Sequence, residues 1–281
     1  MVTLTGVNDE PTKEWALAPA LDALEEIGTR FVELRAVDGK NVDDMANEEF
    51  DRAWELIQSR GFSVTGYDSN LGKCELLPEN FGEEELRLRK AIERTNQTGT
   101  SLIRTMGYRR GPCSVKEWHE RTIDWLRRLT QMAFESGKTL VLENCLDRAS
   151  SMGCTPNDCL DIMESIDSPS LRMNLDPGNF ANWGQDPVQG VELLGKWTAN
   201  LHVKDMKEPG NNSSFCLAGD GVAKIRDVLA VLKELGFEGN VTIEPHLRMH
   251  ESYHYSGWDD YVRAGKRIRQ LLDEAGMVVE R

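Results

Sequence analysis

Four residues of metal-ligand type stand where apolar segments end in the second half of the chain. The segments LVLE, MNLD, LHVKD and VTIEPH supply, in this order, Glu143, Asp176, His202 and Glu244. Any one of them alone would more often cap a strand or form a salt bridge, but four in succession favour a shared site. Three carboxylates brought together would raise their own pKa values unless a cation neutralised them. We therefore expect one divalent metal ion here.

The ligand types also bear on which metal would bind. One imidazole nitrogen with three carboxylate oxygens is a mixed, fairly hard donor set. Such a set suits Mn²⁺, which is the expected ion, or Mg²⁺, and it leaves Co²⁺, Fe²⁺ and Zn²⁺ as alternatives.

Two of the carboxylates could also move protons. A metal chelated by a substrate carbonyl and the neighbouring hydroxyl would stabilise the enediolate formed when a C–H proton is removed. Glu143 and Glu244 could then remove and return that proton from opposite sides, giving epimerisation or isomerisation. Loss of a β-hydroxyl from the same enediolate would give dehydration instead. His246 is a third catalytic candidate, because it would share the face of Glu244 on an extended segment, and a loop-packing role is the alternative.

Basic residues near the expected site indicate how a substrate could be bound. Arg35, Lys73 and Arg104 lie in or just after the second, third and fourth predicted strands. Cations there predict recognition of a carboxylate or another anionic group, or else neutralisation of nearby glutamates. Lys204 is a weaker substrate-binding candidate, since strand alternation points it away from the face of His202 unless the strand has already ended.

The elements that must position these residues alternate along the chain between short β-rich runs and longer amphipathic segments. This alternation is typical of a parallel sheet with crossover helices. The predicted strands are residues 2–7, 31–34, 63–67, 102–106, 140–143, 171–175, 199–203 and 241–244. The predicted helices are residues 14–27, 47–60, 83–95, 115–135, 156–166, 187–194, 222–235 and 258–274.

Eight such units predict an α/β protein with the (β/α)8 TIM barrel fold, in which reactive residues come from the C-terminal ends of the strands. The length of 281 residues and the absence of a linker-like segment predict one domain over residues 1–281. A doubly wound open sheet is the structural alternative. It would normally carry a glycine-rich phosphate loop after an early strand, and the sequence has none.

Composition excludes several classes of protein. Lys and Arg number 33 against 47 Asp and Glu, and the resulting net charge of −14 disfavours nucleic acid as a partner. No apolar run approaches a membrane span and no signal peptide stands at the start, so we expect a cytoplasmic protein without a membrane partner. Six cysteines without a CxxC pair are expected to be reduced thiols. A homo-oligomer is compatible with this composition.

The order LVLEN, LDPGNF, LHVKD and IEPHL resembles the sugar phosphate isomerase/epimerase superfamily, the xylose isomerase-like TIM barrels. Segments such as FVELRAVDGKNV and AGDG extend the resemblance over nearly the whole chain. The resemblance implies that Glu143, Asp176, His202 and Glu244 bind the metal. It also implies that the first and last of these carboxylates are the acid/base pair of the epimerase branch.

The sequence differs from two branches of this superfamily at residues that matter for function. The apurinic endonucleases of the superfamily hold three zinc ions with extra histidines, whereas this chain has only five histidines, so a nuclease is disfavoured. Asn179 replaces the histidine of a D-x-x-H pattern that begins at Asp176, which makes Asn179 a substrate-binding candidate and puts the ketose substrate in doubt.

These observations predict a metal-dependent isomerase or epimerase acting on a small keto-sugar, cyclitol or sugar acid. The enzymatic alternative is a metal-dependent lyase or dehydratase on a keto-cyclitol, keto-glycoside or sugar acid. The non-enzyme alternative is a sugar-binding barrel.

Overall fold

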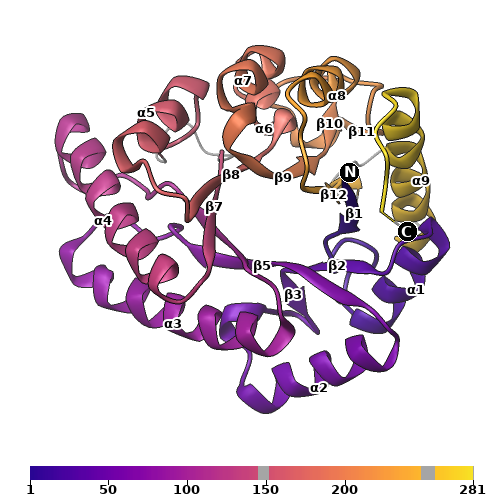
Figure 1. Ribbon diagram of the computed structural model, residues 1–281, viewed down its shortest axis with the longest axis horizontal. Coiled ribbons are helices and arrows are strands. Elements are labelled where there is room, and N and C mark those ends of the chain that lie inside the picture. Colours follow the sequence, from indigo (N-terminus) through magenta and orange to yellow (C-terminus); the bar gives the residue numbers. More distant parts are fainter. Residues whose placement is uncertain (145–151, 248–256, 281) are drawn as a thin grey trace.

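Eight parallel strands form the centre of the protein, for which a computed structural model describes residues 1–144, 152–247 and 257–280. In chain order the strands are β1 (Thr3–Gly6), β2 (Phe31–Leu34), β5 (Ser63–Leu71), β6 (Leu102–Met106), β7 (Thr139–Glu143), β8 (Leu171–Leu175), β9 (Thr198–Val203) and β12 (Asn240–Ile243). Strand β12 pairs with β1, and a bridge from Val7 to Glu33 joins the first strand to the second. The sheet thereby curves into a nearly closed barrel (Figure 1), and the predicted fold class is confirmed.

Helices surround this barrel as an outer layer (Figure 1). They are α1 (Leu17–Ile27), α2 (Asn47–Ser59), α3 (Phe81–Thr98), α4 (Val115–Glu135), α5 (Pro156–Ile166), α6 (Pro177–Asn182), α7 (Pro187–Leu194), α8 (Ile225–Glu234) and α9 (Trp258–Glu274). Two small antiparallel pairs follow strand ends, namely β3 (Ala36–Val37) with β4 (Lys40–Asn41), and β10 (Asp205–Met206) with β11 (Phe215–Cys216). The apolar faces of strands and helices pack into one buried cluster.

Several helix boundaries differ from the prediction for local backbone reasons. The helix predicted over residues 14–27 begins at Leu17, because Trp15 has a φ of 57° and cannot belong to a right-handed helix. Lys224 has a φ of 51°, so the helix predicted over residues 222–235 begins at Ile225. The short helix α6 was not predicted, since six residues carry too little periodicity to be recognised.

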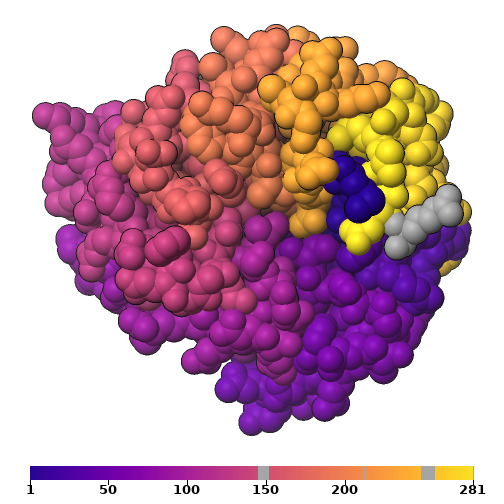
Figure 2. Space-filling view, in the orientation of Figure 1, coloured from indigo at the N-terminus to yellow at the C-terminus, as the bar shows by residue number. Residues whose placement is uncertain are grey.

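The two ends of the chain meet on one face of the barrel. Val2 forms a parallel bridge with Val279, and Figure 2 shows the N-terminal residues beside the C-terminal ones on this face. Gly6 lets helix α9 approach, because a Cβ there would lie 2.1 Å from the hydroxyl of Tyr261. That hydroxyl donates to the carbonyl of Val7 over 2.9 Å, which ties the first strand to the last helix.

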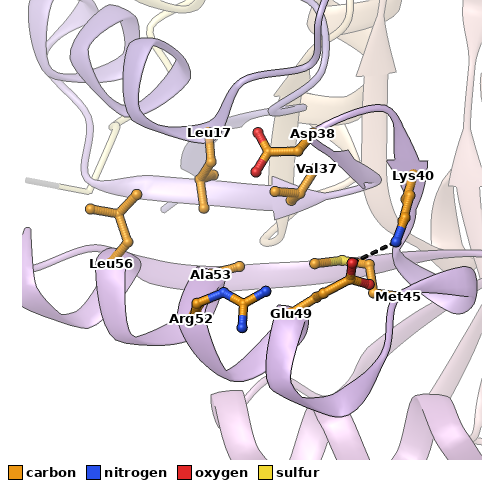
Figure 3. A pocket seen from close by; sticks show the side chains of 9 residues that line it. All are labelled: Leu17, Val37, Asp38, Lys40, Met45, Glu49, Arg52, Ala53 and Leu56. Atoms are coloured by element: carbon orange, nitrogen blue, oxygen red, sulfur yellow. Dashed lines mark hydrogen bonds and ion pairs between the residues drawn. The ribbon is translucent and has the colours of Figure 1, made fainter.

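A shallow groove lies outside the barrel, between the start of α1, the β3–β4 pair and α2 (Figure 3). Both apolar and charged side chains line it, and Lys40 pairs with Glu49 (Figure 3). The lining residues are Leu17, Val37, Asp38, Lys40, Met45, Glu49, Arg52, Ala53 and Leu56. The predicted metal ligands and substrate-binding residues do not line this groove. Among the helices of the described ranges, none is both long and apolar enough to cross a membrane.

Candidate metal centre

The four predicted metal ligands meet at the C-terminal ends of four neighbouring strands. Glu143 ends β7, Asp176 follows β8, His202 lies near the end of β9 and Glu244 follows β12. Each is at most 2% exposed, and one ligand atom from each lies within 4.8 Å of the others. Nδ1 of His202 is 3.1 Å from Oε2 of Glu244 and 3.4 Å from Oε1 of Glu143. The histidine therefore presents Nδ1 to the carboxylates.

A cation contacts each carboxylate of this group. The ammonium of Lys204 contacts Asp176 and lies 2.9 Å from Oε2 of Glu244. Arg104 Nη1 lies 3.2 Å from Oε2 of Glu143. Lys204 turns inward because β9 ends at Val203, so strand alternation no longer sets its direction. The ammonium thus lies inside the candidate centre.

The electrostatics of the group indicate an excess of buried negative charge. Burial raises the pKa of Asp176 to about 6, against the opposing effect of Lys204. Burial also acts to raise the pKa of Glu143, but Arg104 and His202 outweigh it and hold that pKa at about 2. Burial would lower the pKa of His202, yet the surrounding glutamates raise it well above the usual value. Three carboxylates and one imidazole in a buried space form a donor set that fits a divalent cation.

Arg35 holds Glu244 from the first-strand side of the barrel. Its guanidinium contacts Glu244, lies 2.6 Å from Oδ1 of Asp9 and 3.1 Å from Oε1 of Glu10. Asp9 and Glu10 follow β1 and were not predicted as site residues, although an acidic pair just past a strand end was a signal for them. Arg35 is therefore surrounded by three carboxylates.

Arg104 and Lys73 have different surroundings. Arg104 is buried, and its Nη1 lies 3.0 Å from Oδ2 of Asp68 in addition to its contact with Glu143. The side chain of Lys73 is exposed in the loop after β5, and it makes no ion pair with any residue in the described parts of the chain. Lys73 is thus the predicted substrate-binding cation whose charge is available to a ligand.

His246 lies beside Glu244, but not on an extended segment as expected. Its backbone is left-handed with a φ of 49°, and its ring centre lies 5.2 Å from that of Phe215. Nδ1 is 2.8 Å from Oε1 of Glu10, and Nε2 is 3.6 Å from Oε1 of Glu244. The left-handed backbone at His246, and not strand alternation, therefore places the imidazole beside the carboxylate of Glu244. His250 and His254 lie outside the described residues.

Asn179 is buried and holds the end of β8 in place. Its side-chain amide donates to the carbonyl of Asn144 over 2.8 Å, and its backbone N–H donates to Oδ1 of Asp176 over 2.9 Å. The same Asn144 donates to the carbonyl of Asp176 over 2.8 Å. Asp176 is thus fixed by its own helix α6 and by the neighbouring strand end.

The family of this chain follows from the fold, the site and a sequence match together. Residues 21–270 match the family described as xylose isomerase-like TIM barrel. The chain belongs to this family. Eight parallel strands with carboxylates and a histidine at their C-terminal ends agree with that membership.

The curated relatives of this chain include proteins with an assigned activity. The chain is 26% identical over 147 residues to 2-epi-5-epi-valiolone 7-phosphate 2-epimerase of Actinoplanes sp., which covers 52% of this chain and 51% of that enzyme. The chain thus spans about half the length of this relative.

Two solved structures resemble the whole fold. The IOLI protein with a bound zinc atom has a TM-score of 0.80 at 17% identity, covering 98% of this chain and 99% of the other. The protein described as the probable 3-DHS dehydratase AsbF of Bacillus anthracis has a TM-score of 0.75 at 15% identity, covering 95% and 99%. At these identities the likeness shows the fold. The curated sequence relatives include enzymes, among them epimerases.

Proposed function

We propose that this protein is a divalent-metal-dependent enzyme that epimerises or isomerises a small keto-sugar, cyclitol or sugar acid by proton transfer. The observation that carries the proposal is the convergence of Glu143, Asp176, His202 and Glu244, buried and within 4.8 Å of one another at the barrel's C-terminal end. The similarity to an epimerase of Actinoplanes sp. supports the reaction class.

In this proposal the four converging residues hold one ion, with Mn²⁺ as the first choice for one imidazole and three carboxylates. When bound, the ion would polarise a substrate carbonyl and make the adjacent C–H more acidic. Lys204 is near enough to the same ligands to donate a hydrogen bond to a substrate oxygen, which would deepen the stabilisation of negative charge there.

Glu143 and Glu244 would transfer the proton. The pKa of Glu244 is far below its usual value because Lys204 and His202 outweigh burial, and that of Glu143 is about 2. Both side chains are therefore ionised at neutral pH, which is the form in which a carboxylate binds a metal or acts as a base. The carboxylates come from β7 and the end of β12, so they approach a substrate from different strands. Nε2 of His246 lies 3.6 Å from Oε1 of Glu244, so His246 is the further catalytic candidate beside this pair.

The substrate's charge would be sensed at Lys73. Arg35 and Arg104 already contact carboxylates of the protein, so in this proposal they hold Glu244 and Glu143 in position. Lys73 is exposed and remains for the carboxylate of a sugar acid. Asn179 would act by holding Asp176, in addition to any contact with substrate.

A lyase that expels water is the second candidate. It begins with the same proton removal and differs in the next step, in which a β-hydroxyl group is lost. The ammonium of Lys204 beside these carboxylates favours it, because a fixed positive charge could stabilise the leaving hydroxyl group. The fold shared with AsbF is compatible with this candidate.

Metal analysis followed by a substrate screen in deuterated water tests the proposal. The purified protein should hold about one divalent ion per chain, and Asp176→Ala should lose it. Keto-sugars, keto-cyclitols and their acids are then incubated with metal-loaded protein and analysed by mass. An isomer that gains one deuterium supports the epimerase or isomerase, whereas loss of one water supports the lyase. A metal-loaded protein that exchanges no hydrogen in any compound contradicts both.

A further inference from the structure

A second polar cluster lies inside the barrel, one layer nearer to the N-terminal ends of the strands. It joins Glu33 of β2, Asp68 of β5 and the Nε2 atom of His202, all buried. Oε1 of Glu33 lies 2.8 Å from Nε2, on the opposite side of the ring from Nδ1. Each ring nitrogen of His202 therefore faces a carboxylate: Nδ1 faces Glu244 in the group of four, and Nε2 faces Glu33 on the other side. A metal held by the group of four would use the lone pair of Nδ1, which leaves the ring proton on Nε2, where Glu33 can accept it.

Glu33 is itself held in one position. Its other oxygen, Oε2, accepts from the hydroxyl of Thr242 over 2.7 Å and from the amide of Asn200 over 3.0 Å. Gly66 leaves room for its side chain, because a Cβ at that position would lie 3.1 Å from Cγ of Glu33. Both oxygens and the aliphatic part of the side chain are therefore fixed by neighbours on three other strands.

We propose that Glu33 is a positioning residue that fixes the ring orientation and tautomer of His202, so that Nδ1 is presented to the divalent metal. The inference rests on the metal binding of the proposed function. A carboxylate that accepts from the outer nitrogen of a metal-binding histidine typically contributes about 10 to 100-fold to metal affinity. The effect reaches the metal through His202, since Glu33 does not belong to the group of four ligands.

A second metal ion between Glu33, Asp68 and His202 is the competing explanation of the cluster. It would require His202 to bind through both nitrogens and therefore to lose both ring protons. This double deprotonation is costly, which favours the positioning role.

Titration calorimetry of Mn²⁺ into chelator-treated protein tests the inference. Glu33→Gln keeps the shape but weakens the acceptor, and we expect its affinity for Mn²⁺ to fall by about 10 to 100-fold. Glu84→Gln is the matched control, because Glu84 is equally buried but accepts from Gly72 N–H, outside the cluster. The control should bind Mn²⁺ within about twofold of the parent protein. Circular dichroism and thermal unfolding confirm that both variants are folded.

Nuclear magnetic resonance of ¹⁵N-histidine-labelled, Zn²⁺-loaded protein measures how fast the imidazole protons exchange with water. This exchange rate should stay the same if Glu33 only stabilises the fold. The parent should show one Nε2–H proton that exchanges slowly with water, and Glu33→Gln should lose that slow exchange. If Glu33→Gln does not fold, Thr242→Val removes one donor to Oε2 and should still lower the Mn²⁺ affinity at least about threefold.

Parent affinity in the folded Glu33→Gln variant, or in Thr242→Val if it is the variant tested, overturns the inference. Two ions per parent chain, with one lost on Glu33→Gln, also overturn it in favour of the second metal. A parent protein that binds no metal overturns the proposed function and this inference with it. Equal binding by parent and variants overturns this inference alone.

Discussion

At the scale of single residues, the candidate centre is a set of carboxylates held by cations. Arg35 and Lys204 contact Glu244, and Arg104 contacts Glu143. A buried carboxylate without such a partner would be costly, and one paired in this way remains ionised. The arrangement therefore keeps two proton acceptors charged inside the barrel.

Replacing Glu143 or Glu244 with Gln should abolish proton transfer while leaving the shape of the site nearly unchanged. An amide is a very weak base, so turnover should fall at least ~10²-fold. Exchange of the substrate C–H with deuterated water should vanish in the variant that lacks the base for that proton. Metal content, measured on the same samples, is the control. If both variants bind metal and exchange hydrogen at the parent rate, these glutamates are ligands only and His246 becomes the next base to test.

Lys204→Met should destabilise the metal-free protein more than the metal-loaded one. Without the ammonium, Asp176 and Glu244 lose a buried partner, which costs on the order of 3–5 kcal/mol. A divalent ion would restore the lost positive charge. Thermal unfolding with chelator and with Mn²⁺ measures the difference. Lys224→Met, which breaks an exposed pair with Asp186, is the control and should change little. An equal loss for Lys204→Met in both conditions would contradict the prediction.

At the scale of elements, the loop after β9 is organised by one side chain. Asp205, the first residue of β10, accepts from the backbone N–H groups of Gly219, Gly221 and Ala223 over 2.9 to 3.0 Å. These bonds fold the glycine-rich segment back onto β10, which follows the strand that carries His202. The AGDG motif therefore has a structural role here, as a loop that fits closely around a carboxylate.

Gly221→Ala should destabilise the protein by about 1–3 kcal/mol, because overpacking of a close contact forces backbone shifts. The added Cβ would lie 2.3 Å from Oδ1 of Asp205 and 2.3 Å from the carbonyl of Met206. Gly82→Ala is the control, since its Cβ would meet nothing within 4 Å and alanine favours the first turn of α3. Urea unfolding compares the two. If Gly221→Ala loses no more stability than Gly82→Ala, the loop accommodates the added Cβ without cost and the prediction is wrong.

At the scale of the whole molecule, a metal would link four strands that are successive in the barrel. The predicted ligands come from β7, β8, β9 and the end of β12, which form half of the sheet. A ligand that binds only the folded chain stabilises it in proportion to the logarithm of its concentration.

Metal should accordingly raise the thermal stability of the protein. At a free concentration of about 100 times Kd the gain is about 2.7 kcal/mol, which should raise Tm by on the order of 5 °C for a chain of this size. Scanning calorimetry with Mn²⁺ and with chelator measures the shift. His202→Ala should show none, whereas an unchanged Tm in the parent protein would argue against a metal that bridges these strands.

The sequence by itself determined the architecture and the first layer of the candidate site. The alternation of strand and helix patterns is local, so the eight strands and the residues at their ends could be located without a structure. Once a barrel is expected, those ends must converge, which is why Glu143, Asp176, His202 and Glu244 could be grouped together. The short helix α6 and the left-handed residues at Trp15 and Lys224 were missed, because one or two residues change a boundary without changing the period.

Only the tertiary structure decided which partners hold these side chains. Arg35 reaches Glu244 across 209 positions of sequence, and Glu33 reaches His202 across 169. Lys204 turns into the centre because β9 ends one residue before it, a boundary that periodicity does not resolve. Local sequence patterns predict which face of its own helix or strand a side chain occupies. Its partner depends on strand register and barrel closure, which are properties of the whole chain.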